Sequence, residues 1–529
     1  MCFVDDLTTD TVVTAGLSLC STRLLFRQDI IDPLEPVTRQ MIHALSTQYA
    51  GISIIAKEPS DSWAVVGMAN FMTELFLKHL SGNNEYRYRQ KKAADRVHDL
   101  DFQRPSLHAF GAILHLDPSE YEFMALKAGL VLYILDRRLT KSGGSAGMTR
   151  IVSRVIGNAK GGESEFSALS TTQFQKTCEK IGHMKLDAFF QQWVFGAGCP
   201  NFTVSQRFNK KKFVIEMMIK QTQGDRAATP HDLDPDMFMR DVKEDLHEVY
   251  EGQLQPVFTG PMTIRIHEAD GTPYEHIVEI KEAITKFEIP YNTKYKRLKR
   301  SRRQKERAAG TGVMDVSADV QDDVLLYCLG DVLQSEEEVA EWQLTDWSKD
   351  EEDRMGQESY EWIRMDADFE WICKMTIGMP AYMFVSQLQQ DRDVVAQMES
   401  LQYIAMQKGH PLVSTILTRT LVDRRYFHGV RTMAAVGLTK CAKDELDWIG
   451  LYHLEKTFQE FFCFSDSPMT RSNDFSDRTS YLVQCAIPRA ISKIRNNAGQ
   501  APMRVKRFFV DKLKFNDNSN NEVCPVKVC

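Results

Sequence analysis

His43 and Thr47 stand at two positions whose spacing could serve metal chemistry. They are four residues apart in a segment expected to be helical, so both side chains lie on one face about one turn apart. In the H-E-x-x-H zinc pattern these positions carry histidines, and a glutamate beside the first histidine acts as general base. Here His43 is kept, Ala44 stands at the position of the base, and Thr47 stands at the position of the second ligand.

The residues that follow indicate which kind of site has been altered. Gln48-Tyr49-Ala50-Gly51 follows Thr47 directly, and Trp63-Ala64-Val65-Val66-Gly67-Met68-Ala69 comes further on. These segments resemble the HQWFG and W-x-x-E-G-x-A motifs of the gluzincin aminopeptidases, the M1 family. The resemblance implies that the glutamate of the second motif, the family's third zinc ligand, is replaced here by Val66.

Two later segments extend this resemblance. Residues 124–135, MALKAGLVLYIL, are similar to Y-x-K-G-A-x-x-L-x-x-L, and Ala125 takes the place of the tyrosine that stabilises the oxyanion in that family. Residues 186–200, LDAFFQQWVFGAGCP, are similar to FFxQWxxxxGxP, which ends the helical catalytic domain. We therefore expect a degenerate aminopeptidase-like helical domain over residues 1–200.

The substitutions remove the chemistry of a zinc peptidase. A catalytic zinc ion needs about three protein ligands, an open position for water and a nearby base. One imidazole at His43 cannot supply this set, so we expect no catalytic residues, no metal, no cofactor and no enzymatic activity. The alternative is an active zinc aminopeptidase with rearranged ligands, in which His43 would combine with His98 or His108.

Composition describes a globular protein without a dominant charge. The 529 residues are 43% hydrophobic and 26% charged, and the net charge of −7 gives no global signature of polyanion binding. The 11 cysteines include no C-x-x-C pair, which favours reduced thiols in a cytosolic or nuclear protein. No apolar run approaches the length of a membrane span, and the N-terminus lacks a signal-peptide pattern.

From residue 201 the apolar period changes from that of a helix to that of a strand. Alternation on either side of Asp270-Gly271 predicts a hairpin, and a second hairpin is expected across Asn209. We predict an antiparallel β-sandwich over residues 201–375 with a charged, disordered insert at about 291–358. Its strands are expected at Phe202–Ser205, Lys212–Lys220, Met262–Ile266, His276–Ile280 and Tyr360–Asp366.

A basic tract within this insert is the strongest local charge feature. Only Glu306 opposes its cations, and such a run is typical of a nuclear-import signal, a nucleic-acid contact or a solvated loop. The acidic residues that follow favour an insert without a packed core. The tract consists of Lys294, Lys296, Arg297, Lys299, Arg300, Arg302, Arg303, Lys305 and Arg307.

Helical periodicity dominates the remainder, residues 376–529. Asp423 followed by V-R-x-x-A-A is similar to HEAT-type helix pairs, so we predict a HEAT/ARM-like α-solenoid. Helices are expected at Phe384–Ala405, Pro411–Val422, Tyr426–Lys440, Leu446–Phe464 and Tyr481–Asn496, the last kinked or broken at Pro488. The predicted fold class is thus α+β multidomain.

Taken together, these segments resemble the TBP-associated factor 2 family, the M1-aminopeptidase-like subunits of the general transcription factor TFIID. The most specific segments are FTGPMTIRIHEADGTPYEH (258–276), WIRMDADFEW (362–371) and RDVVAQMESL (392–401). The resemblance implies a fragment that lacks the family's N-terminal β-domain and ends within the helical array.

The resemblance also implies a function and a set of partners. It implies a nuclear, non-catalytic scaffold of TFIID that joins other TBP-associated factors and TBP. Core-promoter DNA at the initiator would be met through the assembled complex during RNA polymerase II initiation, with no small-molecule substrate and no membrane. A standalone DNA-binding protein acting through residues 294–307 is a further alternative.

Overall fold

The computed structural model describes most of the chain, in two compact units. The described residues are 1–27, 31–101, 104–110, 118–143, 147–161, 167–223, 254–268, 273–292, 329–348, 350, 360–407 and 410–516. The first unit comprises Met1–Arg265, Glu275–Tyr291 and Arg364–Gly378. The second comprises Ile266–Tyr274, Asn292–Ile363 and Met379–Cys529.

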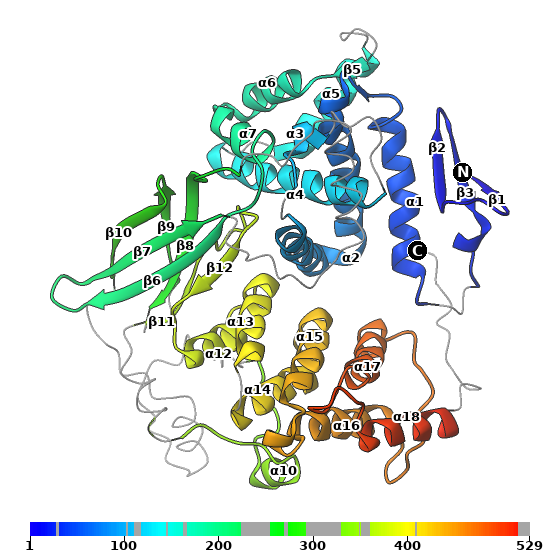
Figure 1. The fold of residues 1–529 in the computed structure, drawn as a ribbon, viewed down its shortest axis with the longest axis vertical. Coiled ribbons are helices and arrows are strands. Elements are labelled where there is room, and N and C mark those ends of the chain that lie inside the picture. The colour runs from blue at the N-terminus through cyan, green and yellow to red at the C-terminus, as the bar shows by residue number, and fades with distance from the viewer. Residues whose placement is uncertain are drawn as a thin grey trace, which may run out of the picture. The chain divides into compact units, whose positions relative to one another are not determined.

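The first unit begins with a small sheet and continues with helices (Figure 1). The sheet has the strand order β1-β3-β2, in which β1 runs parallel and β2 antiparallel to β3. A second, two-stranded sheet pairs β4 with β5. The elements are β1 (Cys2–Val4), β2 (Thr11–Thr14), β3 (Leu17–Ser21), α1 (Leu34–Tyr49), β4 (Ile55–Ala56), α2 (Ser62–Leu100), α3 (Leu107–Phe110), α4 (Pro118–Gly143), α5 (Gly147–Lys160), β5 (Ala168–Leu169), α6 (Thr171–Gly182) and α7 (Asp187–Trp193).

Helices α2 and α4 form the core of the helical part and pack closely against each other (Figure 1). The approach is closest at Gly67, where a Cβ atom would lie 3.2 Å from the carbonyl oxygen of Ala128 and from Leu132 Cδ1. A glycine here lets the two backbones approach, which a larger residue would prevent. Further along α2, Gly82 has a φ of 87° and bends the helix, a conformation that favours glycine.

Buried polar contacts fix both ends of α2. At its start, Asp61 Oδ1 accepts hydrogen bonds from the backbone N–H and the hydroxyl of Thr171, at 2.8 and 2.7 Å. Beyond its end, the carboxylate of Asp101 accepts a 2.7 Å hydrogen bond from Lys127 Nζ on α4. Because both charged side chains are 1% exposed, each depends on the other for the solvation that water no longer supplies.

The β-sandwich contains the antiparallel hairpin predicted across Asn209, while the turn predicted at Asp270-Gly271 lies outside the described residues. Strand β6 pairs with β7 over the full length of both strands, and β8 neighbours β9. The sheets have the orders β10-β7-β6-β12 and β11-β8-β9, and the boundary between the two units falls within the second. The strands are β6 (Asn201–Asn209), β7 (Val214–Thr222), β8 (Gly260–Glu268), β9 (Pro273–Ile280), β10 (Ile284–Pro290), β11 (Tyr360–Arg364) and β12 (Lys374–Ile377).

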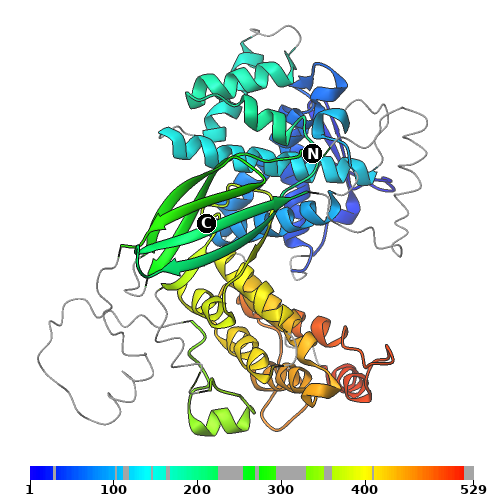
Figure 2. The same ribbon diagram turned by 60° about the vertical axis from the view of Figure 1, so that its left-hand side comes forward.

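Aromatic side chains fill the sandwich, whose strands are drawn in green in Figures 1 and 2. Trp371 follows β11, and its ring meets that of Phe202 on β6 edge to face at 5.4 Å. Its indole N–H donates to the carbonyl of Pro261 on β8 at 3.0 Å. One side chain thereby links strands of both sheets.

Strand β12, which the sequence did not predict, lies parallel to β6 at the sheet edge.

The second unit is a helical array. Its elements are α10 (Glu336–Glu341), α12 (Ala381–Gln390), α13 (Val394–Met406), α14 (Pro411–Val422), α15 (His428–Leu438), α16 (Ile449–Phe462), α17 (Arg478–Ile491) and α18 (Met503–Phe515). Packing contacts link α12 with α13, α14 with α15 and with α16, and α15 with α17 (Figure 1). Helix α18 was not anticipated from the sequence.

One helix prediction in this array was wrong. The expected helix Phe384–Ala405 is two helices, because the backbone leaves helical geometry after Gln390 and Asp393 then caps α13 by accepting from Val395 N–H at 3.1 Å. The helix expected to be kinked or broken at Pro488 is not broken there, and α17 runs through this residue to Ile491.

The prediction of a disordered insert was wrong for residues 329–348. This segment contains α10, which starts at a capping box between Ser335 and Glu338, and it packs on the array through Trp342 and Leu344. Residues 293–328, 349 and 351–359 of the predicted insert lie outside the described residues.

Candidate functional site

Helix α1 places His43, Ala44 and Thr47 beside α2. His43 is half-buried, and its Nδ1 lies 3.4 Å from the hydroxyl oxygen of Thr73 on α2. The hydroxyl of Thr47 donates at 2.9 Å to the carbonyl oxygen of His43, one turn back on the same helix. Ala44 is buried. The second position of the zinc pattern therefore holds a hydroxyl already engaged by its own helix.

Val66 and Ala125 lie on the two helices that pack at Gly67. Val66 is half-buried in the first turns of α2, and its carbonyl accepts from the side-chain amide of Asn70 at 3.0 Å. Ala125 is half-buried on α4, three residues before Ala128, which faces Gly67. Thus α2 connects the elements of the degenerate site: it contacts α1 through Thr73 and α4 through Gly67.

The electrostatics around His43 oppose a bound cation. Burial and the nearby guanidinium of Arg39 lower the pKa of His43, which favours the neutral imidazole. Arg39 forms an ion pair with Glu74 of α2, and Arg89 lies 3.5 Å from the other oxygen of that carboxylate. The carboxylate of Glu74 is therefore neutralised by arginines, and the guanidinium of Arg39 would repel a divalent ion.

The histidines of the alternative metal site are engaged elsewhere. His98 Nε2 lies 2.5 Å from the side-chain oxygen of Asn201, at the start of β6. The ring of His108 packs against Phe195, with 4.8 Å between the ring centroids. Within the described ranges, no three His, Cys, Asp or Glu side chains are grouped so that they could hold a metal ion.

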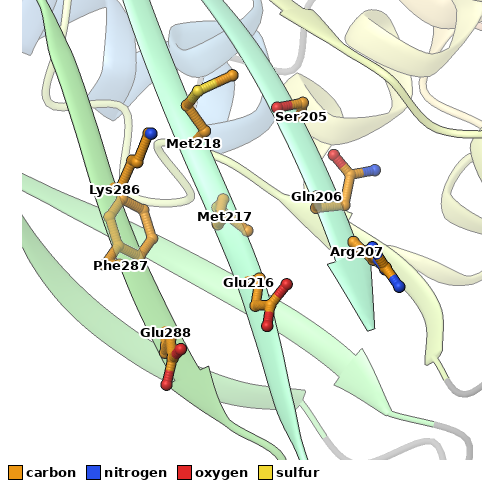
Figure 3. A pocket seen from close by; sticks show the side chains of 9 residues that line it. All are labelled: Ser205, Gln206, Arg207, Glu216, Met217, Met218, Lys286, Phe287 and Glu288. Carbon is orange, nitrogen blue, oxygen red and sulfur yellow. The ribbon is translucent and has the colours of Figure 1, made fainter. Parts of the chain in front are cut away.

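An open depression lies on the four-stranded sheet, and its two carboxylates are already engaged. Figure 3 shows it across strands β6, β7 and β10. The carboxylate of Glu216 already accepts from Asn209 at 2.7 Å, and that of Glu288 from Lys212 at 2.9 Å. With both carboxylates already paired, neither is free to bind a cation. The depression is lined by Ser205, Gln206, Arg207, Glu216, Met217, Met218, Lys286, Phe287 and Glu288.

The basic tract of residues 294–307 lies outside the described residues, so its role stays a prediction. Among the described helices, none is both long and apolar enough to cross a membrane.

Sequence reasoning missed two groups around the degenerate site. Thr73 stands seven residues after Val66, two helical turns further along α2, and this spacing could have suggested that it reaches the same region. The burial of Lys127 against Asp101 had no local signal, because the two residues are 26 positions apart and the pairing depends on the fold.

Comparison with solved structures identifies the fold. Over 97% of this chain and 50% of the other, the structure matches aminopeptidase A of Legionella pneumophila, solved in complex with aspartic acid, with a TM-score of 0.56. The sequence identity is 11%, so this likeness concerns the fold alone. The expected α+β multidomain, aminopeptidase-like architecture is confirmed.

Comparison with known sequences identifies the family. The family model "TAF2 Ig-like domain" matches residues 197–380, and "TAF2-like, TPR repeats" matches residues 381–525. Proteins named transcription initiation factor TFIID subunit 2 are 46% identical over 99% of the chain in Schizosaccharomyces pombe and 37% identical over 96% in Saccharomyces cerevisiae. The chain spans 44% and 37% of the lengths of these relatives. The chain belongs to the TAF2 family.

Proposed function

We propose that this chain is part of a non-catalytic scaffold subunit of TFIID, in which it contributes to assembly of the complex and to core-promoter recognition at the initiator. The observation that carries the proposal is an aminopeptidase-like fold with residue types unsuited to zinc catalysis at the positions that the motifs assign to the reaction. His43 remains, while Ala44, Thr47, Val66 and Ala125 stand where a base, two ligands and an oxyanion-binding tyrosine would be needed.

The chemistry of peptide hydrolysis fails at each step with these residues. A neutral imidazole beside Arg39 cannot retain zinc alone, since catalytic zinc takes about three protein ligands. Alanine at position 44 cannot remove a proton from water, and alanine at position 125 cannot stabilise an oxyanion. The engagement of His98 and His108 elsewhere gives no support to rearranged ligands.

The name of the relatives supports the choice among non-catalytic roles. The matched proteins are named subunits of TFIID, a transcription initiation factor, which favours a nuclear location and partnership with TBP and other TBP-associated factors. Promoter DNA is proposed as a partner of the assembled complex. The basic tract is proposed as a nuclear-import signal or a DNA contact, consistent with its charge.

Metal and activity measurements test the non-catalytic part of the proposal. Purified protein, dialysed against trace zinc, should contain well under one zinc ion per chain by mass spectrometry and should not hydrolyse aminoacyl fluorogenic substrates. Stoichiometric zinc together with peptide hydrolysis would establish the alternative function instead.

Cross-linking tests the assembly part. Affinity purification of the tagged, full-length protein from nuclear extract, followed by cross-linking and mass spectrometry, should recover TBP-associated factors cross-linked to this chain. Recovery without any TFIID component would contradict the assignment.

Replacing the nine basic residues of the tract by alanine separates its two roles: a loss of nuclear import indicates a signal, whereas a weaker salt dependence of DNA binding indicates contact with phosphates.

A further inference from the structure

Residues 329–348, here called the docked segment, are held by side chains that bind its main chain. Asp423 accepts from Gly330 N–H at 2.7 Å, and Arg419 donates to the Leu333 carbonyl at 3.2 Å. Further along, three side chains of α14 and α16 bind the backbone: Tyr452 donates to the carbonyl of Glu341 at 2.7 Å, His453 to that of Trp342 at 2.8 Å, and Thr415 accepts from Thr345 N–H at 2.9 Å.

Side chains of the docked segment add specific contacts. Trp342 is 5% and Leu344 8% exposed, and both pack in a cluster with Val422 of α14. Lys456 of α16 lies 5.1 Å from the centre of the Trp342 ring and 2.9 Å from the carboxylate of Glu341. Arg419 lies 3.5 Å from Asp346. The pattern read by these contacts is Glu-Trp-x-Leu-x-Asp.

The surface beneath the segment contains a buried polar pair, and one of its donors binds the segment. We call it the α14–α16 surface. Ser414 and His453 are completely buried, and their side chains are 2.7 Å apart. Because the carbonyl of Trp342 can only accept, His453 Nε2 carries the proton, and the neutral ring accepts from the Ser414 hydroxyl at Nδ1. Without the docked segment, the Nε2–H group of His453 would lose this carbonyl as its hydrogen-bond acceptor.

We propose that the α14–α16 surface is a peptide-binding site for acidic segments of the form Glu-Trp-x-Leu-x-Asp, with the docked segment as its ligand in cis. Glu341 and Trp342 end α10, so the surface binds the C-terminal end of a short helix and the residues after it. Main-chain hydrogen bonds, two apolar anchors and two cations together make this recognition specific for the peptide. A segment of the same chemistry on another protein would therefore compete for this surface. No feature of the degenerate peptidase site enters this proposal.

Occupation in cis determines what a binding experiment should show. A tethered ligand acts at an effective concentration on the order of millimolar, so the intact chain should bind an added peptide poorly. Replacing Trp342 and Leu344 by alanine removes both anchors from the docked segment. It changes no residue of the α14–α16 surface. This variant should accept a peptide supplied in trans.

The test uses the full chain and a fluorescent synthetic peptide of residues 329–348. Fluorescence anisotropy should give at least about tenfold tighter apparent binding to the Trp342→Ala/Leu344→Ala variant than to wild type. Adding Lys456→Glu should reduce this binding at least about tenfold, whereas the matched surface change Lys493→Glu should leave it unchanged. A peptide with both anchors replaced by alanine should not bind.

Three outcomes would overturn the proposal. One is a variant with an unchanged circular dichroism spectrum that does not bind the peptide, and another is binding that Lys456→Glu does not affect. If the variant does not fold, a second measurement decides: protease sites are introduced on both sides of the docked segment in the otherwise wild-type chain. After cleavage, the labelled peptide should replace the cut segment, and a cut segment that never exchanges is the third contradicting outcome.

Discussion

At the scale of single residues, the positions of the zinc pattern combine side chains unsuited to zinc with ordinary helix packing. Thr47 and Val66 stand where the pattern would need zinc ligands, and His43 lies against α2 through Thr73. Burial and, to a smaller extent, Arg39 lower the pKa of His43, and the positive charge of Arg39 disfavours a metal ion beside it. The residue types at these positions therefore do not favour zinc chemistry, while α1 packs on α2.

Restoring ligands at these positions should restore metal binding. The Thr47→His/Val66→Glu variant would offer two imidazoles and a carboxylate, a set typical of zinc peptidases. We expect about one zinc ion per chain after metal loading, measured by mass spectrometry of the dialysed protein. Wild type and the His43→Ala form of the variant serve as controls. A folded variant that stays metal-free would contradict the assignment of positions 43, 47 and 66 to a zinc pattern.

His453 should make stability depend on pH. Burial lowers its pKa from 6.5 to about 4 in the folded protein, so the unfolded chain binds the proton more readily between these values. The neutral ring therefore stabilises the fold fully above pH 6.5, and this contribution is lost as the pH falls toward 4. Between a pH above 6.5 and a pH below 4, the free energy of unfolding should change by about 3 kcal/mol through this group.

Urea unfolding between pH 4.5 and 7.5 measures this effect. The His453→Gln variant keeps a donor for the Trp342 carbonyl and removes the titrating group, so its unfolding free energy should change less with pH than that of wild type. Identical pH profiles for the two proteins would show that His453 does not contribute.

At the scale of secondary structure elements, a buried ion pair joins the end of α2 to α4. Burial disfavours the charged form of Lys127, but Asp101 outweighs this effect and raises its pKa. Cys199 also donates to the same carboxylate oxygen, at 3.2 Å. The carboxylate thus holds together the residue after α2, helix α4 and the segment that leads into β6.

Removing one partner of this pair should be costly. Lys127→Met leaves the Asp101 carboxylate buried without its cation, and we expect a loss of about 3–5 kcal/mol in the free energy of unfolding. The double variant Lys127→Met/Asp101→Leu should lose less than the sum of the two single variants, because neither charge is then left alone. Chemical denaturation of the three variants measures this, and simple additivity would contradict the pairing.

The contact between α2 and α4 should resist larger side chains at Gly67. Valine there would press against the backbone of Ala128 and against Leu132, and we expect a loss of about 1–3 kcal/mol from overpacking. The matched control is Gly157→Ala on α5, where a Cβ atom meets nothing within 4 Å. That control should be neutral or slightly stabilising, since alanine has the higher helix propensity. Equal losses at both sites would contradict the inferred close approach.

Local signals explain which elements could be predicted. The β6–β7 hairpin and α14 follow from period-two and helical patterns that need no distant partner. The break between α12 and α13 falls in the polar run of residues 389–393, and Asp393 in this run caps α13, a local signal that periodicity does not measure. The docked segment is acidic in sequence, and its order comes from residues such as Asp423 and His453, about a hundred positions away. At the degenerate site, motifs located His43 and Val66, but Arg39 and Thr73 required the fold.

At the scale of the whole molecule, the division into two compact units predicts how the chain unfolds. Units with separate cores commonly unfold in separate transitions. Lys127 and Asp101 belong to the first unit and His453 to the second.

Differential scanning calorimetry should therefore resolve two transitions. Lys127→Met should lower the midpoint of one transition, and acidification from pH 7 to 5 should lower the other more in wild type than in His453→Gln. A single transition that responds equally to both changes would indicate that the two units unfold as one.

The parallel pairing of β12 with β6 has a consequence for where the chain can change in length. Asn201 is the first residue of β6, and Lys374, the first residue of β12, is its partner on the neighbouring strand. The chain between these two residues therefore starts and ends at the same place in the sheet. Residues added within positions 293–328 would therefore lengthen the chain between β6 and β12 without adding a residue to either strand, so the register of this pair can tolerate them.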